Sequence, residues 1–276
     1  MRIVVLVKPV PDPASAGERL GSDRRLDRAV APAVINGNDE YALEAALKLV
    51  AAAPDGGEVT LLSMAPTAAP ETLRKALAMG ATRGVHVTDP ALAGSDAVST
   101  ARVLAAALRE LEFDLVLAGV DTSDGVGGTV PAALAAHLHL PCLSYAARIE
   151  PDEAAGTVRV RRISATGYDL LEAPMPALIS CTQALGEPRY PSLKGIMAAR
   201  SKEILTRSLG DLGLDPATVG GGVATTAVLG TSNPPARGAT EVVRGAPAEV
   251  RAALTPERRR GEMVLVLSGN GRTRKS

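Results

Sequence analysis

A glycine-rich loop between a predicted strand and a predicted helix carries the clearest chemical signal in this sequence. The strand covers residues 114–118, and Gly127 and Gly128 precede a helix that begins at about Thr129. Pro131 suits the first helical turn because proline has no N–H to leave unpaired there. Free N–H groups at a helix start attract anions, and glycine lets the backbone approach them. The loop therefore predicts a phosphate site, although a tight turn without a ligand would use the same residues.

Three other segments are expected at the same edge of the fold. Residues 6–8 leave the first predicted strand, residues 36–39 precede the first predicted helix, and residues 63–66 leave the second strand. Ligands of open α/β sheets bind outside the carboxyl ends of the strands, where the strand order reverses. These segments therefore extend the predicted site. An ordinary turn at Asn36 and Gly37, and a core-filling role for Met64, are the alternatives.

A second signal lies in residues 187–203, where two prolines hold an extended lead-in to a short helix that begins near Leu193. Leu193, Ile196 and Met197 stand among basic residues in this helix. Apolar side chains rimmed by charge are typical of a surface that docks another protein. The alternative is a loop that covers the protein's own core.

Residues for acid–base or metal chemistry do not form a recognisable set. His86 falls in a predicted strand, and His137 and His139 flank a helix end. Asp121 and Asp124 could bind a metal, but aspartates in a glycine-rich loop also serve as turn residues. We therefore predict no catalytic residues and no metal site, as in a protein whose cofactor does the redox chemistry.

Alternating strands and helices must position these residues. Continuous apolar runs predict strands buried on both faces, and the alternation predicts a doubly wound, mainly parallel α/β sheet. The expected strands cover residues 3–7, 59–63, 84–87 and 114–118, and the expected helices begin near Asn38 (capped by Asn38 or Asp39) and cover residues 71–79, 97–111 and 129–137.

The pattern changes after Pro141. Strand-like segments at residues 143–149, 158–163, 168–172 and 177–180 are separated by turns alone, which predicts added antiparallel hairpin strands. From residue 209 the apolar pattern thins, so we expect a domain at residues 1–208 and an extended C-terminal arm at residues 209–276. The arm has one short predicted helix near residues 247–254, and either lies on a partner or forms a flexible tail.

Composition excludes several classes of protein. Among 276 residues, 30 basic side chains balance 30 acidic ones, so the charge gives no reason to expect nucleic acid as a partner. Cys142 and Cys181 lack the spacing of a disulfide scaffold or zinc site, which fits a reducing compartment. The first apolar run is too short to span a bilayer and leaves no room for a signal peptide. We expect a cytoplasmic protein without membrane insertion.

Several of these segments together resemble the beta subunit of bacterial electron transfer flavoproteins. The similarity covers residues 7–12, 36–46, 73–87, 114–131 and 187–203, which is most of the first two hundred residues. It implies a heterodimer in which an alpha subunit holds most of the FAD and this chain binds a structural AMP. It also implies electron transfer from acyl-CoA or related dehydrogenases to a membrane quinone oxidoreductase, as in fatty acid β-oxidation.

The resemblance also implies roles for individual residues. Leu193 would anchor partner dehydrogenases together with Arg189, Tyr190, Ile196 and Met197, and the arm from residue 209 would contact the alpha subunit. Asp169 falls where the family has an acidic residue that steadies or releases this loop; a solvated strand position is the alternative. The residues that would line the AMP pocket are Leu6, Asn36, Gly37, Asn38, Asp39, Met64, Gly119, Val120, Asp121, Thr122, Ser123, Asp124, Gly125, Val126, Gly127, Gly128 and Thr129.

The chain departs from the family pattern in two places. Glycines replace an amide or threonine before the helix at Thr129, and neither Pro13 nor Asn38 is the aromatic residue often found there. One alternative is a bifurcating flavoprotein with a second FAD in this pocket and NADH as donor. Another is an ATP-binding stress-protein-like module, which would show a Ser-Gly-Gly loop where this chain has residues 8–11.

Overall fold

The computed structural model describes residues 1–15, 19–28, 31–232, 246 and 252. One compact unit covers Met1–Gly230, and Thr231–Ser276 forms a second. Leu209 and Val219 are buried in the core of the first unit, which therefore extends past the expected boundary at residue 208. From residue 233 the expected arm, with its helix near residues 247–254, lies outside the described residues except for residues 246 and 252.

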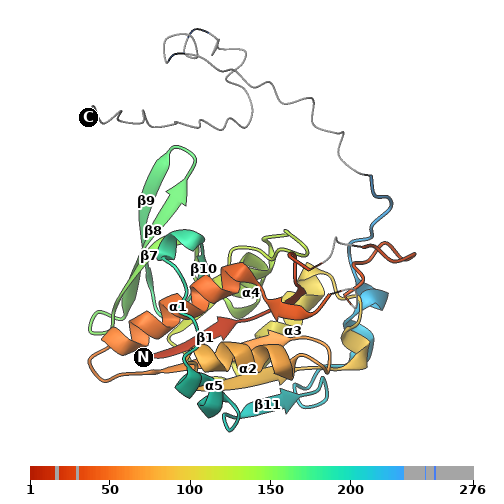
Figure 1. The fold of residues 1–276 in the computed structure, drawn as a ribbon, viewed down its shortest axis with the longest axis horizontal. Coiled ribbons are helices and arrows are strands. Elements are labelled where there is room, and N and C mark those ends of the chain that lie inside the picture. Colours follow the sequence, from red (N-terminus) through yellow and green to blue (C-terminus); the bar gives the residue numbers. More distant parts are fainter. Residues whose placement is uncertain (16–18, 29–30, 233–245, 247–251, 253–276) are drawn as a thin grey trace, which may run out of the picture. The chain divides into compact units, whose positions relative to one another are not determined.

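A single large sheet organises the first unit (Figure 1). Within the described residues its nine strands run in the order β11-β5-β4-β1-β6-β10-β7-β8-β9. All pairs from β11 to β7 are parallel, whereas β7, β8 and β9 pair antiparallel. The strands are β1 Arg2–Leu6, β4 Glu58–Met64, β5 Arg83–Val87, β6 Leu115–Gly119, β7 Cys142–Asp152, β8 Thr157–Ser164, β9 Gly167–Pro174, β10 Ala177–Cys181 and β11 Ile204–Arg207.

Helices cover both faces of the parallel part, which confirms the predicted doubly wound fold. The five α-helices of the described residues are α1 Gly37–Ala52, α2 Pro70–Met79, α3 Ala97–Arg109, α4 Val130–Leu138 and α5 Leu193–Ala199. Ile3 and Val5 of β1 pack with α1 and α2, and their neighbours Val4 and Leu6 pack with α3 and α4. This alternation explains the continuous apolar runs, since both faces of each central strand are buried.

Smaller elements connect this framework. Strands β2 (Pro9–Pro11) and β3 (Ala33–Ile35) form an antiparallel pair outside the main sheet. The short 3₁₀ helices are η1 Pro90–Leu92, η2 Gln183–Leu185, η3 Pro216–Thr218 and η4 Gly221–Val223. The hairpin of β8 and β9 extends beyond the body of the sheet, as Figure 1 shows in green.

Two helix boundaries differ from the prediction. Helix α1 begins at Gly37, so the predicted caps Asn38 and Asp39 lie inside it, and Asn36 at the N-cap makes no capping bond. The side chains of all three residues are instead used in contacts to distant segments, described below. Helix α3 is capped by Asp96, which accepts a hydrogen bond from the Ser99 N–H at 2.8 Å. That helix ends at Arg109 rather than at residue 111.

The strand order reverses at β1. From β1 the chain adds β4 and β5 on one side and then returns to place β6 on the other side. The connections after β1 and β6 therefore diverge, which leaves a crevice position at the carboxyl ends of these two strands. The start of α1 and the glycine-rich loop after β6 both lie at this edge. In the described residues, no helix has the length and apolarity needed to cross a bilayer.

Candidate functional site

Asp39 joins the carboxyl ends of β1 and β6. Its Oδ2 accepts a hydrogen bond from the Lys8 N–H at 2.8 Å, and its Oδ1 accepts one from the Gly119 N–H at 3.2 Å. The residue is 4% exposed. Burial raises the pKa of this carboxyl to about 7, although the donated hydrogen bonds act in the opposite direction. One side chain of α1 thus holds the two strands at the point where their order reverses.

Gly119 allows this close approach. A Cβ at this position would lie 2.4 Å from Asp39 Oδ1 and 2.8 Å from the Asn38 Cβ. Both distances are far shorter than any normal contact with a Cβ atom. A glycine is therefore required where the first turn of α1 passes the end of β6.

Two amides of the same turn hold the start of the glycine-rich loop. Asn36 Nδ2 donates to the Asp121 carbonyl at 2.9 Å, and Asn36 Oδ1 accepts from the Ser123 N–H at 3.1 Å. Asn38 Nδ2 donates to Asp121 Oδ1 at 2.6 Å. These bonds explain why Asn36 does not cap α1: its side chain satisfies the loop instead. The structure therefore brings the predicted segments 36–39 and 119–129 together.

An ion-pair cluster fixes the next part of the loop. Lys8 Nζ lies 2.9 Å from Asp124 Oδ1 and 3.3 Å from Thr122 Oγ1, and Arg28 pairs with Asp124 Oδ2. The Asp124 side chain is 2% exposed. Burial alone would raise its pKa, but hydrogen bonds from Thr122, Lys8 and Arg28 and the charge of Lys8 lower the pKa to about 2. Asp124 is therefore an ionised, fully paired carboxylate.

The last part of the loop keeps its backbone donors available. Among the described residues, no acceptor pairs with the N–H groups of Gly127, Gly128 and Thr129. The Thr129 side chain makes no capping bond to α4. Val126 is exposed and has a φ of 46°, which a β-branched residue rarely adopts. Free N–H groups before a helix are the chemistry that an anionic ligand needs.

The remaining predicted pocket residues take ordinary structural places near this edge. Leu6 is the last residue of β1 and is buried against the α3 side of the sheet. Met64 ends β4 and is half-buried against the same cluster. Val120 donates its N–H to the Cys181 carbonyl, and Gly125 lies in the exposed turn after Asp124.

The predicted docking segment presents an exposed apolar surface. Tyr190 is 95% exposed, Leu193 78%, Met197 56% and Ile196 46%. Ser192 caps α5 by accepting a hydrogen bond from the Gly195 N–H at 3.0 Å. These four side chains do not cover the core of this chain, whereas Ala199 of the same helix is buried in the core.

Helix α5 is mounted firmly on α2. A Cβ on Gly195 would lie 2.4 Å from the Ala78 carbonyl oxygen, so the two helices approach closely. Arg74 Nη1 of α2 donates to the Ala199 carbonyl at 2.7 Å. Lys202 Nζ donates to the carbonyls of Leu77 and Ala81 at 3.1 Å and 2.6 Å, where α2 ends. The exposed surface is therefore carried on a fixed backbone.

Two other predicted docking residues have partners within the chain. Arg189 Nε lies 2.7 Å from Glu44 Oε2, and its Nη2 lies 3.2 Å from Glu44 Oε1. This bidentate pair connects the docking segment to α1. Asp169 lies on β9 and pairs with Arg162 Nη2 at 2.7 Å. Since β9 is at one end of the strand order and α5 packs on α2, the structure does not bring Asp169 to the docking segment.

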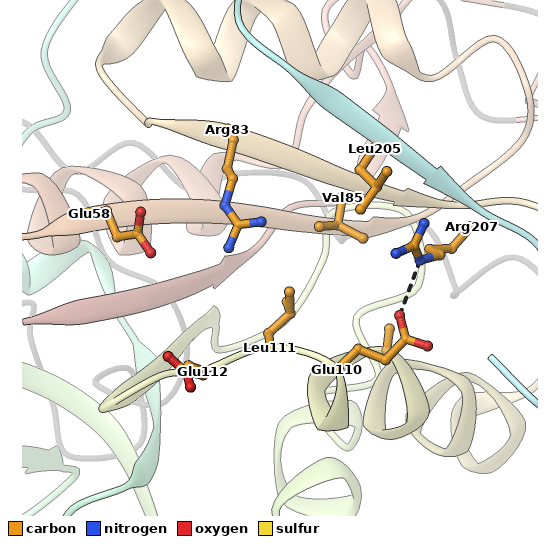
Figure 2. A pocket seen from close by; sticks show the side chains of 9 residues that line it. Glu58, Arg83, Val85, Glu110, Leu111, Glu112, Leu205 and Arg207 are labelled. Carbon is orange, nitrogen blue, oxygen red and sulfur yellow. Dashed lines mark hydrogen bonds and ion pairs between the residues drawn. The ribbon is translucent and has the colours of Figure 1, made fainter. Parts of the chain in front are cut away.

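A pocket at another edge of the sheet is separate from this site (Figure 2). It lies where β4 and β5 begin and where α3 ends. Its two arginines face three glutamates, and Arg207 pairs with Glu110 at 3.1 Å. Mixed charge favours no class of ionic ligand. Among the described residues, no group of three or more His, Cys, Asp or Glu side chains could hold a metal.

The sequence placed Lys8 at this edge, in the segment of residues 6–8, but did not predict its ion pair with Asp124, and it did not predict Arg28. Lys8 follows β1 directly, so its place at the carboxyl edge was a usable signal. Arg28 gave none, because its pairing with Asp124 spans 96 residues.

The buried carboxyl of Asp39 predicts a pH-dependent stability. Its native pKa of about 7 lies above the ordinary 3.8, so the folded state binds more protons between these values. The stability that Asp39 adds by binding this proton is greatest below pH 3.8 and is lost as pH rises to about 7. Between pH 5 and pH 8, the urea midpoint of the wild type should fall further than the urea midpoint of the Asp39→Asn variant. Equal pH dependence of the two proteins would contradict this assignment.

The fold and the edge define a class: a doubly wound α/β domain with a polar, glycine-rich loop at its switch point. A model of the electron transfer flavoprotein domain matches residues 25–212. The chain is 42% identical over 245 residues to the electron transfer flavoprotein subunit beta of Mycobacterium tuberculosis, covering 87% of this chain and 91% of that protein. It is 34% identical over 275 residues to the same subunit of Megasphaera elsdenii, covering 96% and 91%.

A third relative is the caffeyl-CoA reductase-Etf complex subunit CarD of Acetobacterium woodii, 35% identical over 248 residues, or 89% of this chain and 92% of that protein. The chain belongs to the electron transfer flavoprotein family, as one of its beta subunits. Its role is therefore electron transfer, and the subunit type implies an alpha partner.

Proposed function

We propose that this chain, in a cytoplasmic heterodimer, relays electrons from acyl-CoA or related dehydrogenases to a membrane quinone oxidoreductase. The FAD that carries the electrons would be held mainly by the alpha subunit. One observation carries the proposal: Leu193 is 78% exposed on a helix whose backbone is tied to α2. A rigid apolar anchor lowers the entropy lost when a partner binds. The dehydrogenase would dock there, and the arm from residue 209 would contact the alpha subunit.

We further propose that the edge site holds a structural AMP. The free N–H groups of Gly127, Gly128 and Thr129 fit a phosphate group, and the missing Cβ at Gly127 and Gly128 leaves space for it. Asn36, Asn38 and Asp39 would position the loop. In this proposal, the side chains of this chain carry out no proton transfer or electron transfer step. The FAD supplies the redox chemistry, and this chain contributes docking and support.

Ligand analysis of the co-expressed heterodimer tests the proposal. Denaturing the purified complex should release about one FAD and one AMP, since the two cofactors occupy different subunits. Chromatography with absorbance detection counts both. A complex that releases flavin but no nucleotide would contradict the AMP site, and one that releases no flavin would contradict the carrier function.

A bifurcating carrier is the second candidate, with FAD in place of AMP and NADH as donor. One observation favours this candidate: a relative is named as a subunit of a caffeyl-CoA reductase-Etf complex. The same extraction separates the two cases: two flavins per heterodimer and no AMP would select the bifurcating type. An isolated chain that hydrolyses ATP would instead indicate the stress-protein-like module.

A further inference from the structure

The glycine-rich loop contains its own counter-ion. Asp124 accepts from Lys8 Nζ at 2.9 Å and pairs with Arg28, and its side chain is 2% exposed. Lys8 follows β1, while Arg28 comes from the loop before β3. Lys8 and Arg28, the cations that the described residues bring to this loop, are thus already bound to a carboxylate of the loop that would receive the phosphate.

The charge at the edge is therefore balanced. Lys8 and Arg28 are matched by Asp124 and by Asp121, whose Oδ1 accepts from Asn38 Nδ2. The backbone N–H groups of residues 127–129 pair with no acceptor among the described residues and can donate to an anion. Such dipoles bind one phosphate well, but a second phosphate adds negative charge beside the ionised carboxylate of Asp124.

We propose that Asp124 makes this site selective for a ligand with one phosphate group, by holding Lys8 and Arg28 in ion pairs. This inference rests on the nucleotide binding proposed above. A diphosphate would need one of these cations, and taking it would leave a buried carboxylate without its partner. Breaking a buried pair in this way is costly. Asp124 is thus a specificity-determining residue that acts through Lys8 and Arg28.

The test measures which nucleotide the heterodimer selects. The complex is unfolded and refolded with FAD and equal concentrations of AMP and ADP, without Mg²⁺, and the bound nucleotides are extracted and counted. Asp124→Asn frees both cations and should lower the bound AMP:ADP ratio on the order of tenfold. The nucleotide that co-purifies from cells gives the same ratio for a variant that does not refold.

Two further variants separate charge from loop damage. Asp124→Glu keeps the charge and should keep the preference for AMP. The triple variant Lys8→Met/Arg28→Met/Asp124→Asn leaves neither cation free and should recover most of the wild-type ratio. An unchanged ratio in Asp124→Asn, or no recovery in the triple variant, would overturn the inference. A wild-type complex that retains neither nucleotide would refute nucleotide binding itself, and this inference with it.

Discussion

Leu193→Ala should slow reduction of the carrier by its donor dehydrogenase about thirtyfold in kcat/KM, the loss expected for a central docking residue worth about 2 kcal/mol. The side chain is 78% exposed, so truncation removes contact area for a partner without opening a cavity in this chain. Stopped-flow reduction of the heterodimer by an acyl-CoA dehydrogenase measures the rate.

The matched control is Leu20→Ala. Leu20 is also exposed, at 48%, but lies outside the docking segment in the loop before β3. Its variant should reduce at the wild-type rate, and both variants should retain full flavin and nucleotide. If Leu193→Ala is reduced as fast as the wild type by several dehydrogenases, α5 is not the docking helix.

Gly119→Ala should destabilise the complex by about 3 kcal/mol, because overpacking and a broken hydrogen bond to a carboxylate add together. The new Cβ would lie 2.4 Å from Asp39 Oδ1 and 2.9 Å from the Asn38 carbonyl carbon. The backbone of α1 cannot rotate away as a flexible side chain would. The urea midpoint of the purified heterodimer should fall clearly, and bound nucleotide should decrease with it.

Gly125→Ala is the control for this substitution. A Cβ at Gly125 would lie 3.6 Å from Thr122 Oγ1, an ordinary contact, in the same loop. The free energy of unfolding of this variant should stay within about 0.5 kcal/mol of the wild-type value, as for most surface changes. Equal midpoints for the two alanine variants would show that the contact between Gly119 and α1 does not constrain the fold.

The architecture could be predicted because its signals are local. Residues 3–7 and 115–118 are continuous apolar runs, and both correspond to central strands. The change to hairpins after Pro141 is also confirmed in β7, β8 and β9. The fourth expected segment, residues 177–180, is instead β10, which pairs parallel with β6 and β7. Strands β2, β3 and β11 were missed because each has only three or four residues, too few for a periodic pattern, and two of the residues in β2 are prolines.

The site was only partly predictable, for a different reason. Its glycines and the helix start lie close together in sequence, so the loop was recognisable. The bonds that shape it join residues far apart: Lys8 to Asp124 across 116 residues, and Arg189 to Glu44 across 145. Such pairs depend on the strand order, which no local pattern specifies. Asn36 shows the effect most clearly, since local chemistry favours a helix cap and tertiary contacts use its amide elsewhere.

Helix α1 carries Asp39 at its first turn and Glu44 further along, so one helix supports both the ligand edge and the segment that contains Arg189. A substitution that tilts α1 would disturb the ligand edge and the docking segment together. Under the docking proposed above, partner choice can change most safely through the outward side chains of α5, which can vary without moving α1. Laboratory evolution of partner choice should begin with Tyr190, Leu193, Ile196 and Met197.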